Sequence, residues 1–221
     1  MEIRTASSPK DVKHYTTERL REEFLIQNLF VSNEIKLVYS HIDRIITGAA
    51  VPLSPLTLTA GDELRAEYFL QRREMGVINI GGKGTITIDG KVYELENKYG
   101  IYIGMGSKDI VFSSADSSNP AKFYINSAPA HKTYPTVLIK PEDCVFVELG
   151  SLEESNHRTI RKYILPGQVE SCQLVMGMTS LKPGSVWNTM PCHTHDRRME
   201  VYLYFDMPED EIGRASCRER V

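Results

Sequence analysis

Short hydrophobic runs separated by turn residues follow one another along much of the chain. Runs of this length, bounded by Gly, Pro, Asn or Asp, are typical of β-strands joined by tight turns. Many such strands in series favour a barrel or sandwich, so a mainly β fold is expected. The runs that predict strands are Lys36–Ser40, Val77–Ile80, Thr85–Ile88, Lys91–Leu95, Ile101–Ile103 and Ile110–Phe112.

Two glycine-containing segments predict tight hairpins between these strands. Gly81–Gly84 is expected to join the runs on either side of it, and Asp89-Gly90 to form the next turn. No helical pattern follows Gly84, so a hairpin is a better interpretation of this loop than a phosphate-binding site. One short helix is predicted near the start, because Thr16-Thr17 can cap it and Glu18–Leu29 is rich in helix formers.

The most informative segment for chemistry lies near the end of the chain. His193 and His195 are two residues apart, so on a strand both imidazoles project from one face. The polar residues 196–198 can turn the chain and bring Glu200 into the same pocket. Two imidazoles and a carboxylate suit Zn²⁺, Fe²⁺, Mn²⁺, Co²⁺ or Ni²⁺ better than Mg²⁺ or Ca²⁺. The alternative is that the histidines are paired by chance and Glu200 is a solvated surface carboxylate.

The residues after this pair predict a strand with two different faces. Cys192, at an odd offset from His193, is expected to pack away from the histidine face. Alternation along the strand places Met199, Val201, Leu203 and Phe205 on one face, and Glu200, Tyr202 and Tyr204 on the other.

A weak internal repeat relates this segment to an earlier one. Arg197–Tyr204 is similar to the earlier segment Arg72–Ile80, which is the first copy. At the places of His193 and His195, the first copy has Tyr68 and Leu70. The repeat predicts two related antiparallel barrels or jelly rolls, only one of which binds metal.

Domain boundaries follow from this repeat and from composition. The boundary between the barrels is expected in the proline-bearing segment Ala128–Asp143. Residues 1–135 are predicted to form a metal-free N-terminal barrel, and residues 136–210 the first part of a metal-binding barrel. Residues 211–221 include a polar, arginine-rich and aperiodic stretch, which we interpret as a non-native tail; a flexible natural terminus is the alternative.

Composition and charge exclude several classes of protein. The 221 residues are 41% hydrophobic and 25% charged, as in ordinary globular proteins. A net charge of −3 provides no basic surface for nucleic acid or anionic membranes. No apolar run is long enough for a membrane span, and the N-terminus lacks the hydrophobic part of a signal peptide. The four cysteines are scattered, so a cytoplasmic protein with free thiols is expected.

Several segments together resemble a known family. His193-x-His195-x4-Glu200, following Pro183-Gly184, resembles the first motif of the cupin barrels. Over roughly residues 10 to 210 the chain is similar to the bacterial 5-keto-4-deoxyuronate isomerases of that superfamily. The segments that carry this resemblance are Val38–Ile46, Glu74–Gly82, Pro120–Tyr124, Ala128–His131 and Trp187–His195.

The resemblance implies a bicupin fold with a short N-terminal helix, a Zn²⁺ ion and a homo-oligomer, commonly a hexamer. It assigns the metal to His193, His195 and Glu200. The family's fourth ligand is a histidine on a later strand of the second barrel, and this chain has no counterpart. We therefore expect the second barrel to be incomplete and the chain to be impaired in zinc binding and activity.

The reaction that the resemblance implies is an aldose–ketose type isomerisation in pectin and uronate catabolism. It interconverts 5-dehydro-4-deoxy-D-glucuronate and 3-deoxy-D-glycero-2,5-hexodiulosonate, so the partner is a small keto sugar acid. Such a reaction needs an electrophile and a proton-transferring base, and the sequence does not identify the base. Candidates for substrate binding are His131, Arg161, Arg198 and Tyr202. The alternatives are an Fe²⁺-dependent cupin oxygenase and a non-catalytic sugar-binding cupin.

Overall fold

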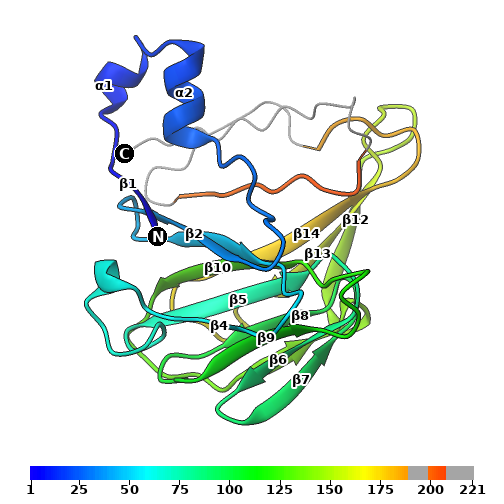
Figure 1. The fold of residues 1–221 in the computed structure, drawn as a ribbon. Helices are drawn as coiled ribbons and strands as arrows, with labels where there is room; N and C mark the ends of the chain where they lie inside the picture. The colour runs from blue at the N-terminus through cyan, green and yellow to red at the C-terminus, as the bar shows by residue number, and fades with distance from the viewer. Residues whose placement is uncertain (189–198, 208–221) are drawn as a thin grey trace.

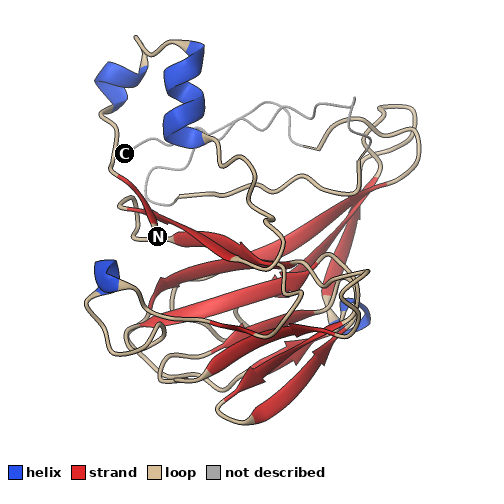
Figure 2. Ribbon diagram, in the orientation of Figure 1, coloured by secondary structure: helices blue, strands red, loops and turns tan. Residues whose placement is uncertain are grey.

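Three β-sheets form the framework of the molecule (Figures 1 and 2). The computed structural model describes residues 1–188 and 199–207. Sheet A has seven strands, sheet B has four and sheet C has three. The predicted mainly β fold is therefore confirmed.

Sheet A is the central layer, with sheets B and C packed on its two faces. Its neighbouring strands are antiparallel, except for the parallel pair β1 and β2. In order across the sheet they are β1 (Glu2–Arg4), β2 (Ile35–Ser40), β3 (Ile46–Ala50), β10 (Phe123–Pro129), β5 (Arg73–Asn79), β8 (Gly100–Ile103) and β11 (Val137–Ile139).

Sheet B covers one face of sheet A and encloses the first hydrophobic core with it, here called core AB. Its strands, in order, are β4 (Leu56–Thr57), β9 (Ile110–Ser114), β6 (Gly84–Ile88) and β7 (Lys91–Leu95). Alternating side chains of the two sheets fill this space, as in other sandwiches. Its fully buried members include Leu70, Met75, Ile86, Phe112 and Phe123.

Sheet C covers the opposite face of sheet A and encloses core AC. It consists of β12 (Val145–Leu149), β13 (Arg158–Ile164) and β14 (Met176–Leu181). Because both faces of β5 are covered, all seven of its residues are buried. Two glycines of sheet A permit the close approach, since a Cβ on Gly76 would meet Met176 and Ile164, and one on Gly100 would meet the ring of Tyr163.

The two predicted hairpins have different outcomes. Asp89-Gly90 does connect β6 and β7, and both residues have positive φ, as a tight hairpin turn requires. The predicted hairpin across Gly81–Gly84 is wrong, because β5 belongs to sheet A and β6 to sheet B. The Asn79 side chain closes this corner by donating to the Gly82 and Leu95 carbonyl oxygens and accepting from the amide of Gly81.

The N-terminal helix forms but is shorter than predicted. Helix α2 spans Thr17–Phe24, and the Thr16 hydroxyl accepts a hydrogen bond from the Arg19 amide, as its capping role predicts. Leu25 is extended, and the Arg4 guanidinium binds the carbonyl oxygens of Glu23 and Leu25, which ends the helix there. The remaining short helices are α1 (Pro9–Val12), η1 (Asp62–Leu64) and η2 (Pro141–Asp143).

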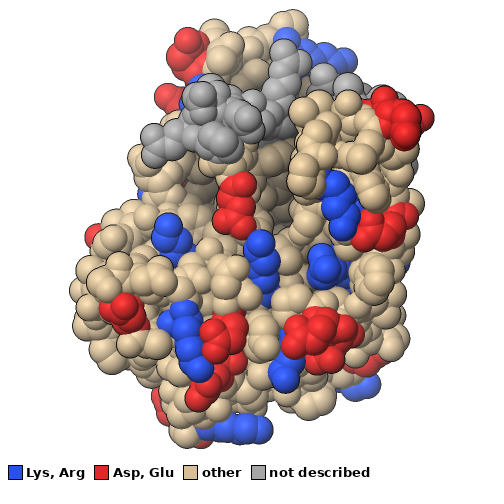
Figure 3. Space-filling model, turned by 90° about the vertical axis from the view of Figure 1, so that its right-hand side faces the viewer, with Lys and Arg blue, Asp and Glu red and all other residues tan. Residues whose placement is uncertain are grey.

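The described surface carries charges of both signs, and the described helices are short. No helix within residues 1–188 or 199–207 is long and apolar enough to cross a membrane. On the face drawn in Figure 3, Lys and Arg side chains are interspersed with Asp and Glu. Strand β11, which follows the boundary predicted at residue 135, pairs with β8 in sheet A. The division into two domains stays a prediction.

We predict that Gly76→Ala destabilises the fold by about 1–3 kcal/mol, because the new methyl group overpacks core AC against Met176 and Ile164. Gly177→Ala is the matched control, because Gly177 is an exposed position of β14 and its Cβ would meet the Arg161 carbonyl oxygen, at 3.0 Å. Urea unfolding followed by circular dichroism measures both. Equal losses for the two variants would contradict the close packing at Gly76.

Candidate metal centre

Segment 199–207, which carries the predicted ligand Glu200, crosses the molecule as an extended chain between α2 and sheet A (orange in Figure 1). Its ends are held at two points. The Met199 amide donates to Asp43 Oδ2 at 2.8 Å, and Asp206 forms an ion pair with Lys98 at 3.2 Å. Leu203 and Phe205 pack against core AC between these points. The segment is therefore positioned by contacts with residues distant in sequence.

The predicted alternation is confirmed over residues 201–205, whereas residues 199–201 are all half-buried and the predicted strand does not form. Leu203 and Phe205 are half-buried, whereas Tyr202 and Tyr204 are 43% and 47% exposed. The segment has extended geometry but pairs with no strand of the described structure. Side-chain period alone therefore fixes its faces, and a hydrogen-bonded ladder does not.

Glu200 is half-buried and is contacted by a tyrosine from the same face. The Tyr202 hydroxyl donates to Glu200 Oε2 at 2.9 Å. This contact follows from the two-residue spacing, because residues i and i+2 of an extended chain project together. A hydroxyl bonded to a carboxylate in this way can orient it for a cation, as outer partners of metal ligands do.

The other predicted ligands cannot be placed beside Glu200. His193, His195 and the substrate candidate Arg198 lie outside the described residues. Within 1–188 and 199–207, no group of three His, Cys, Asp or Glu side chains is arranged to hold a metal. Glu200 is chemically suited to a divalent cation as a carboxylate donor. Its partnership with the two imidazoles stays a prediction.

The structure places two further substrate candidates on separate elements. His131 is exposed in the loop between β10 and β11. Arg161 is half-buried in β13, where its charge lies close enough to Cys144 and Tyr163 to favour their ionised forms. Burial dominates at both, and raises the pKa of the Cys144 thiol and of the Tyr163 hydroxyl. In the described part of the chain, neither candidate forms a hydrogen bond or ion pair with Glu200.

The residues that the predicted internal repeat aligns with the metal motif are Tyr68, Leu70 and Met75. The offset that aligns Tyr68 and Leu70 with the histidine pair aligns Met75 with Glu200. Leu70 and Met75 are fully buried in core AB, and Tyr68 lies beneath the Lys108 ammonium group, 5.7 Å from its ring centre. Leu70 and Met75 of this first copy are therefore part of the hydrophobic core, and the metal-free barrel stays a prediction.

A buried arginine that sequence reasoning missed supports the turn that holds Met199. Arg73 donates to the carbonyl oxygens of Arg44 (2.6 Å) and Ser127 (2.7 Å) and to Ser127 Oγ (3.1 Å). Asp43 and Arg44 both have positive φ, so this turn needs such support. Burial lowers the pKa of Arg73 to about 10. The signal available in the sequence was a charged pair, Arg73-Glu74, at the start of a hydrophobic strand.

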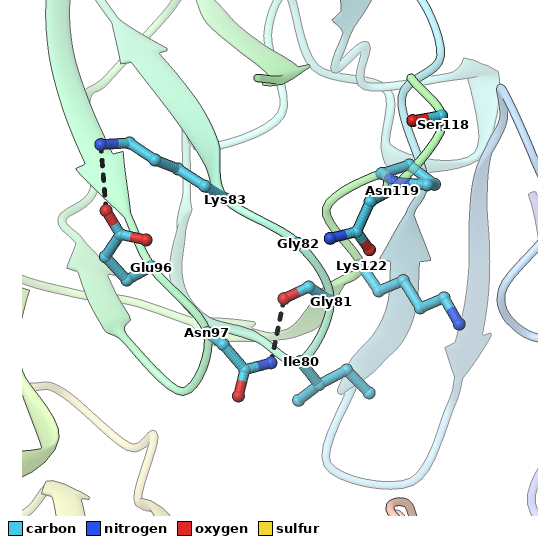
Figure 4. A pocket seen from close by; sticks show the side chains of 10 residues that line it. Ile80, Gly81, Gly82, Lys83, Glu96, Asn97, Ser118, Asn119 and Lys122 are labelled. Atoms are coloured by element: carbon cyan, nitrogen blue, oxygen red, sulfur yellow. Dashed lines mark hydrogen bonds and ion pairs between the residues drawn. The ribbon is translucent and has the colours of Figure 1, made fainter. Parts of the chain in front are cut away.

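A polar hollow of about 690 Å³ lies elsewhere, where β5 leads into β6 (Figure 4). Lys83 lines it, but its ammonium group forms ion pairs with Glu94 (2.8 Å) and Glu96 (2.9 Å), which raise the pKa of Lys83. The Asn97 side chain donates to the Gly81 carbonyl oxygen across the hollow. Glu200 is not among the lining residues, so this hollow is separate from the candidate metal centre.

Comparison with known proteins gives a family and close relatives. Residues 24–212 match the sequence model of the KduI/IolB family. A 4-deoxy-L-threo-5-hexosulose-uronate ketol-isomerase of Lachnoclostridium phytofermentans is 83% identical over 213 residues, which cover 96% of this chain and 77% of that protein. The protein of that name from Lachnospira eligens is 63% identical over 217 residues, covering 96% and 78%.

Solved structures give a more distant likeness. An IolB-like protein from Salmonella typhimurium is 13% identical, with a TM-score of 0.45. The overlap covers 57% of this chain and 47% of that one. A likeness of this extent adds nothing about function.

We predict that Arg73→Lys lowers the free energy of unfolding by about 1–3 kcal/mol, because an ammonium group cannot reproduce the forked contacts with Arg44 and Ser127. Arg72→Lys is the matched control, since Arg72 is exposed and its side chain donates to the carbonyl oxygens of Leu64 and Arg65. Urea denaturation measures both variants. If Arg73→Lys were as stable as Arg72→Lys, the buried guanidinium would not support the turn.

Proposed function

The chain belongs to the KduI/IolB family, and we propose on this basis that it catalyses the ketol isomerisation of 4-deoxy-L-threo-5-hexosulose uronate. The observation that carries the proposal is 83% identity to a protein of that name over 96% of the chain. The reaction interconverts 5-dehydro-4-deoxy-D-glucuronate and 3-deoxy-D-glycero-2,5-hexodiulosonate. The chain would then act in uronate catabolism, on the products of pectin breakdown.

The proposed cofactor is one Zn²⁺ ion, held by His193, His195 and Glu200. When bound, zinc supplies a Lewis acid that stabilises negative charge on a substrate oxygen. Glu200 fits this role as a carboxylate donor that is already half-buried and bonded to Tyr202. The isomerisation also moves a proton between neighbouring carbons, which requires a base that remains to be assigned.

The anchoring of segment 199–207 suits it for orienting a ligand and a substrate. The contacts at Asp43 and Lys98 fix its ends, and Leu203 and Phe205 fix its inner face. Tyr202, on the exposed face, can then hold the Glu200 carboxylate in one orientation. A partly exposed phenol beside the carboxylate is also placed where it can reach a substrate hydroxyl.

Recognition of the substrate carboxylate needs a cationic partner, and Arg is suited to a bidentate contact. We assign this role to Arg161 or Arg198, with His131 as a further polar contact. For the whole protein we propose the bicupin arrangement, a homo-oligomer such as a hexamer, and a cytoplasmic location. The mixed charge of the surface in Figure 3 is compatible with a small-molecule substrate.

A turnover assay tests the proposed reaction directly. Purified protein supplied with zinc is mixed with 4-deoxy-L-threo-5-hexosulose uronate, and proton NMR follows the conversion while an electrode follows oxygen. We expect the isomer as the only product and no oxygen uptake. Iron-dependent oxygen consumption would identify an oxygenase instead, and stabilisation by the sugar acid without conversion would identify a binding protein.

We predict that Tyr202→Phe weakens zinc binding by about 10–100-fold, because the Glu200 carboxylate loses the hydroxyl that orients it. Competition with a chromogenic chelator measures the affinity without reference to turnover. Tyr15→Phe is the control, since Tyr15 lies in the N-terminal region and contacts Arg19 only through its ring. Unchanged zinc affinity in Tyr202→Phe would remove Tyr202 from the metal centre.

A further inference from the structure

Glu74 is a fully buried carboxylate that the proposed reaction does not use. It is the second residue of β5 and lies on the face of sheet A that is covered by core AC. Its Oε2 accepts hydrogen bonds from the Tyr102 hydroxyl (2.8 Å) and the Cys172 amide (2.7 Å). Its Oε1 accepts from the amides of Gln173 and Leu174, each at 2.7 Å. Each carboxylate oxygen therefore accepts two short hydrogen bonds.

In all four of these hydrogen bonds Glu74 is the acceptor. Three of the donors are successive backbone amides, and such a run of N–H groups forms an anion-binding concavity. No Lys or Arg of the described residues forms an ion pair with Glu74. The cost of burying the carboxylate is thus offset by hydrogen bonds rather than by a cation.

The fourth donor is held in its protonated form by the same surroundings. Burial, and then the hydrogen bond to Glu74, raise the pKa of Tyr102 well above its usual range. Tyr102 lies on β8, beside β5 in sheet A, where it pairs with Gly76. The same burial thus favours the protonated phenol, which donates to Glu74 Oε2.

The loop that supplies the amides, residues 171–174, is also bound to the end of β10 and to the loop that follows β10. The Gln173 side chain donates to the Pro129 carbonyl oxygen at 3.0 Å, and the Cys172 thiol contacts the Lys132 carbonyl oxygen at 3.3 Å. Ser171 Oγ closes the loop on itself by donating to the Leu174 carbonyl oxygen at 2.7 Å. These contacts fix the conformation of the loop, which directly precedes β14 (Met176–Leu181) in the chain.

We propose that loop 171–174 is a carboxylate receptor that Glu74 occupies from within the same chain, and that this contact docks sheet C onto sheet A. Glu74 and the three amides are 98 to 100 residues apart in sequence, so the contact joins distant parts of the chain. Next to it, Leu174 and Met176 close over Gly76. Glu74 is therefore a positioning residue for β14.

A receptor of this kind should accept a free carboxylate when its own is removed. Glu74→Ala deletes Cγ, Cδ and both Oε atoms, and acetate carries the same four heavy atoms. The deletion leaves a space lined by three unpaired amides and the Tyr102 hydroxyl. Acetate is then expected to bind there, and neutral acetamide, which offers a single acceptor oxygen, is not.

Hydrogen exchange and thermal unfolding of Glu74→Ala, with and without sodium acetate, test the proposal. We expect amides 172–174 to exchange on the order of tenfold faster in the variant, and acetate to restore their protection. Acetate should raise the Tm of Glu74→Ala by about 2–4 °C more than that of the wild type, and acetamide or sodium chloride should not. Acetate acting equally on both proteins would overturn the proposal.

If Glu74→Ala does not fold in buffer, the variant is refolded in acetate instead. Acetate should then recover the folded protein, and failure to recover it would also overturn the proposal. Glu74→Gln fills the space but sets an amide NH₂ against two of the four donors, so it should be destabilised without any response to acetate. A response of Glu74→Gln equal to that of Glu74→Ala would mean that acetate binds elsewhere.

Discussion

The burial of sheet A on both faces is the constraint on which the other features of this molecule depend. A strand covered on two sides cannot leave a polar group without a partner, because water does not reach it. On β5 this applies to Arg73, Glu74 and Asn79, and each forms its hydrogen bonds with a different part of the chain. Glycine at positions 76 and 100 lets sheet C approach closely enough to complete the covering. The polar residues of one strand thereby determine how turn 41–45, the corner at Gly82 and loop 171–174 are held.

The candidate metal centre depends on this arrangement through the contacts of segment 199–207. Arg73 holds the turn that presents Asp43 to the Met199 amide, and Lys98 holds Asp206 at the other end. Between these points the inner side chains lie on core AC, so Glu200 and Tyr202 are directed away from it. The position of the candidate ligand Glu200 thus results from the packing around its segment, whereas the alternation of the segment decides only which way the side chain faces.

Local patterns predicted local features well and the assembly of the sheets less well. The Thr16 cap, the Asp89-Gly90 turn and the alternation that joins Tyr202 to Glu200 each involve residues two to three positions apart, and the sequence is sufficient for them. The hairpin expected at Gly81–Gly84 fails because the Asn79 side chain satisfies the corner, so that β6 joins another sheet. Glu74 was missed because its amide partners lie 98 to 100 residues away. The ligand roles of His193 and His195 stay predictions.

Convergence of His193, His195 and Glu200 on one divalent ion is the central claim about function. Zinc K-edge X-ray absorption of the metal-loaded protein tests it most directly, with Glu200→Gln compared against Glu22→Gln, a change of an exposed glutamate on α2. We predict imidazole scattering together with a carboxylate oxygen in the wild type and in Glu22→Gln, and the loss of that oxygen ligand in Glu200→Gln. A spectrum unchanged by Glu200→Gln, or one dominated by sulfur, would contradict it.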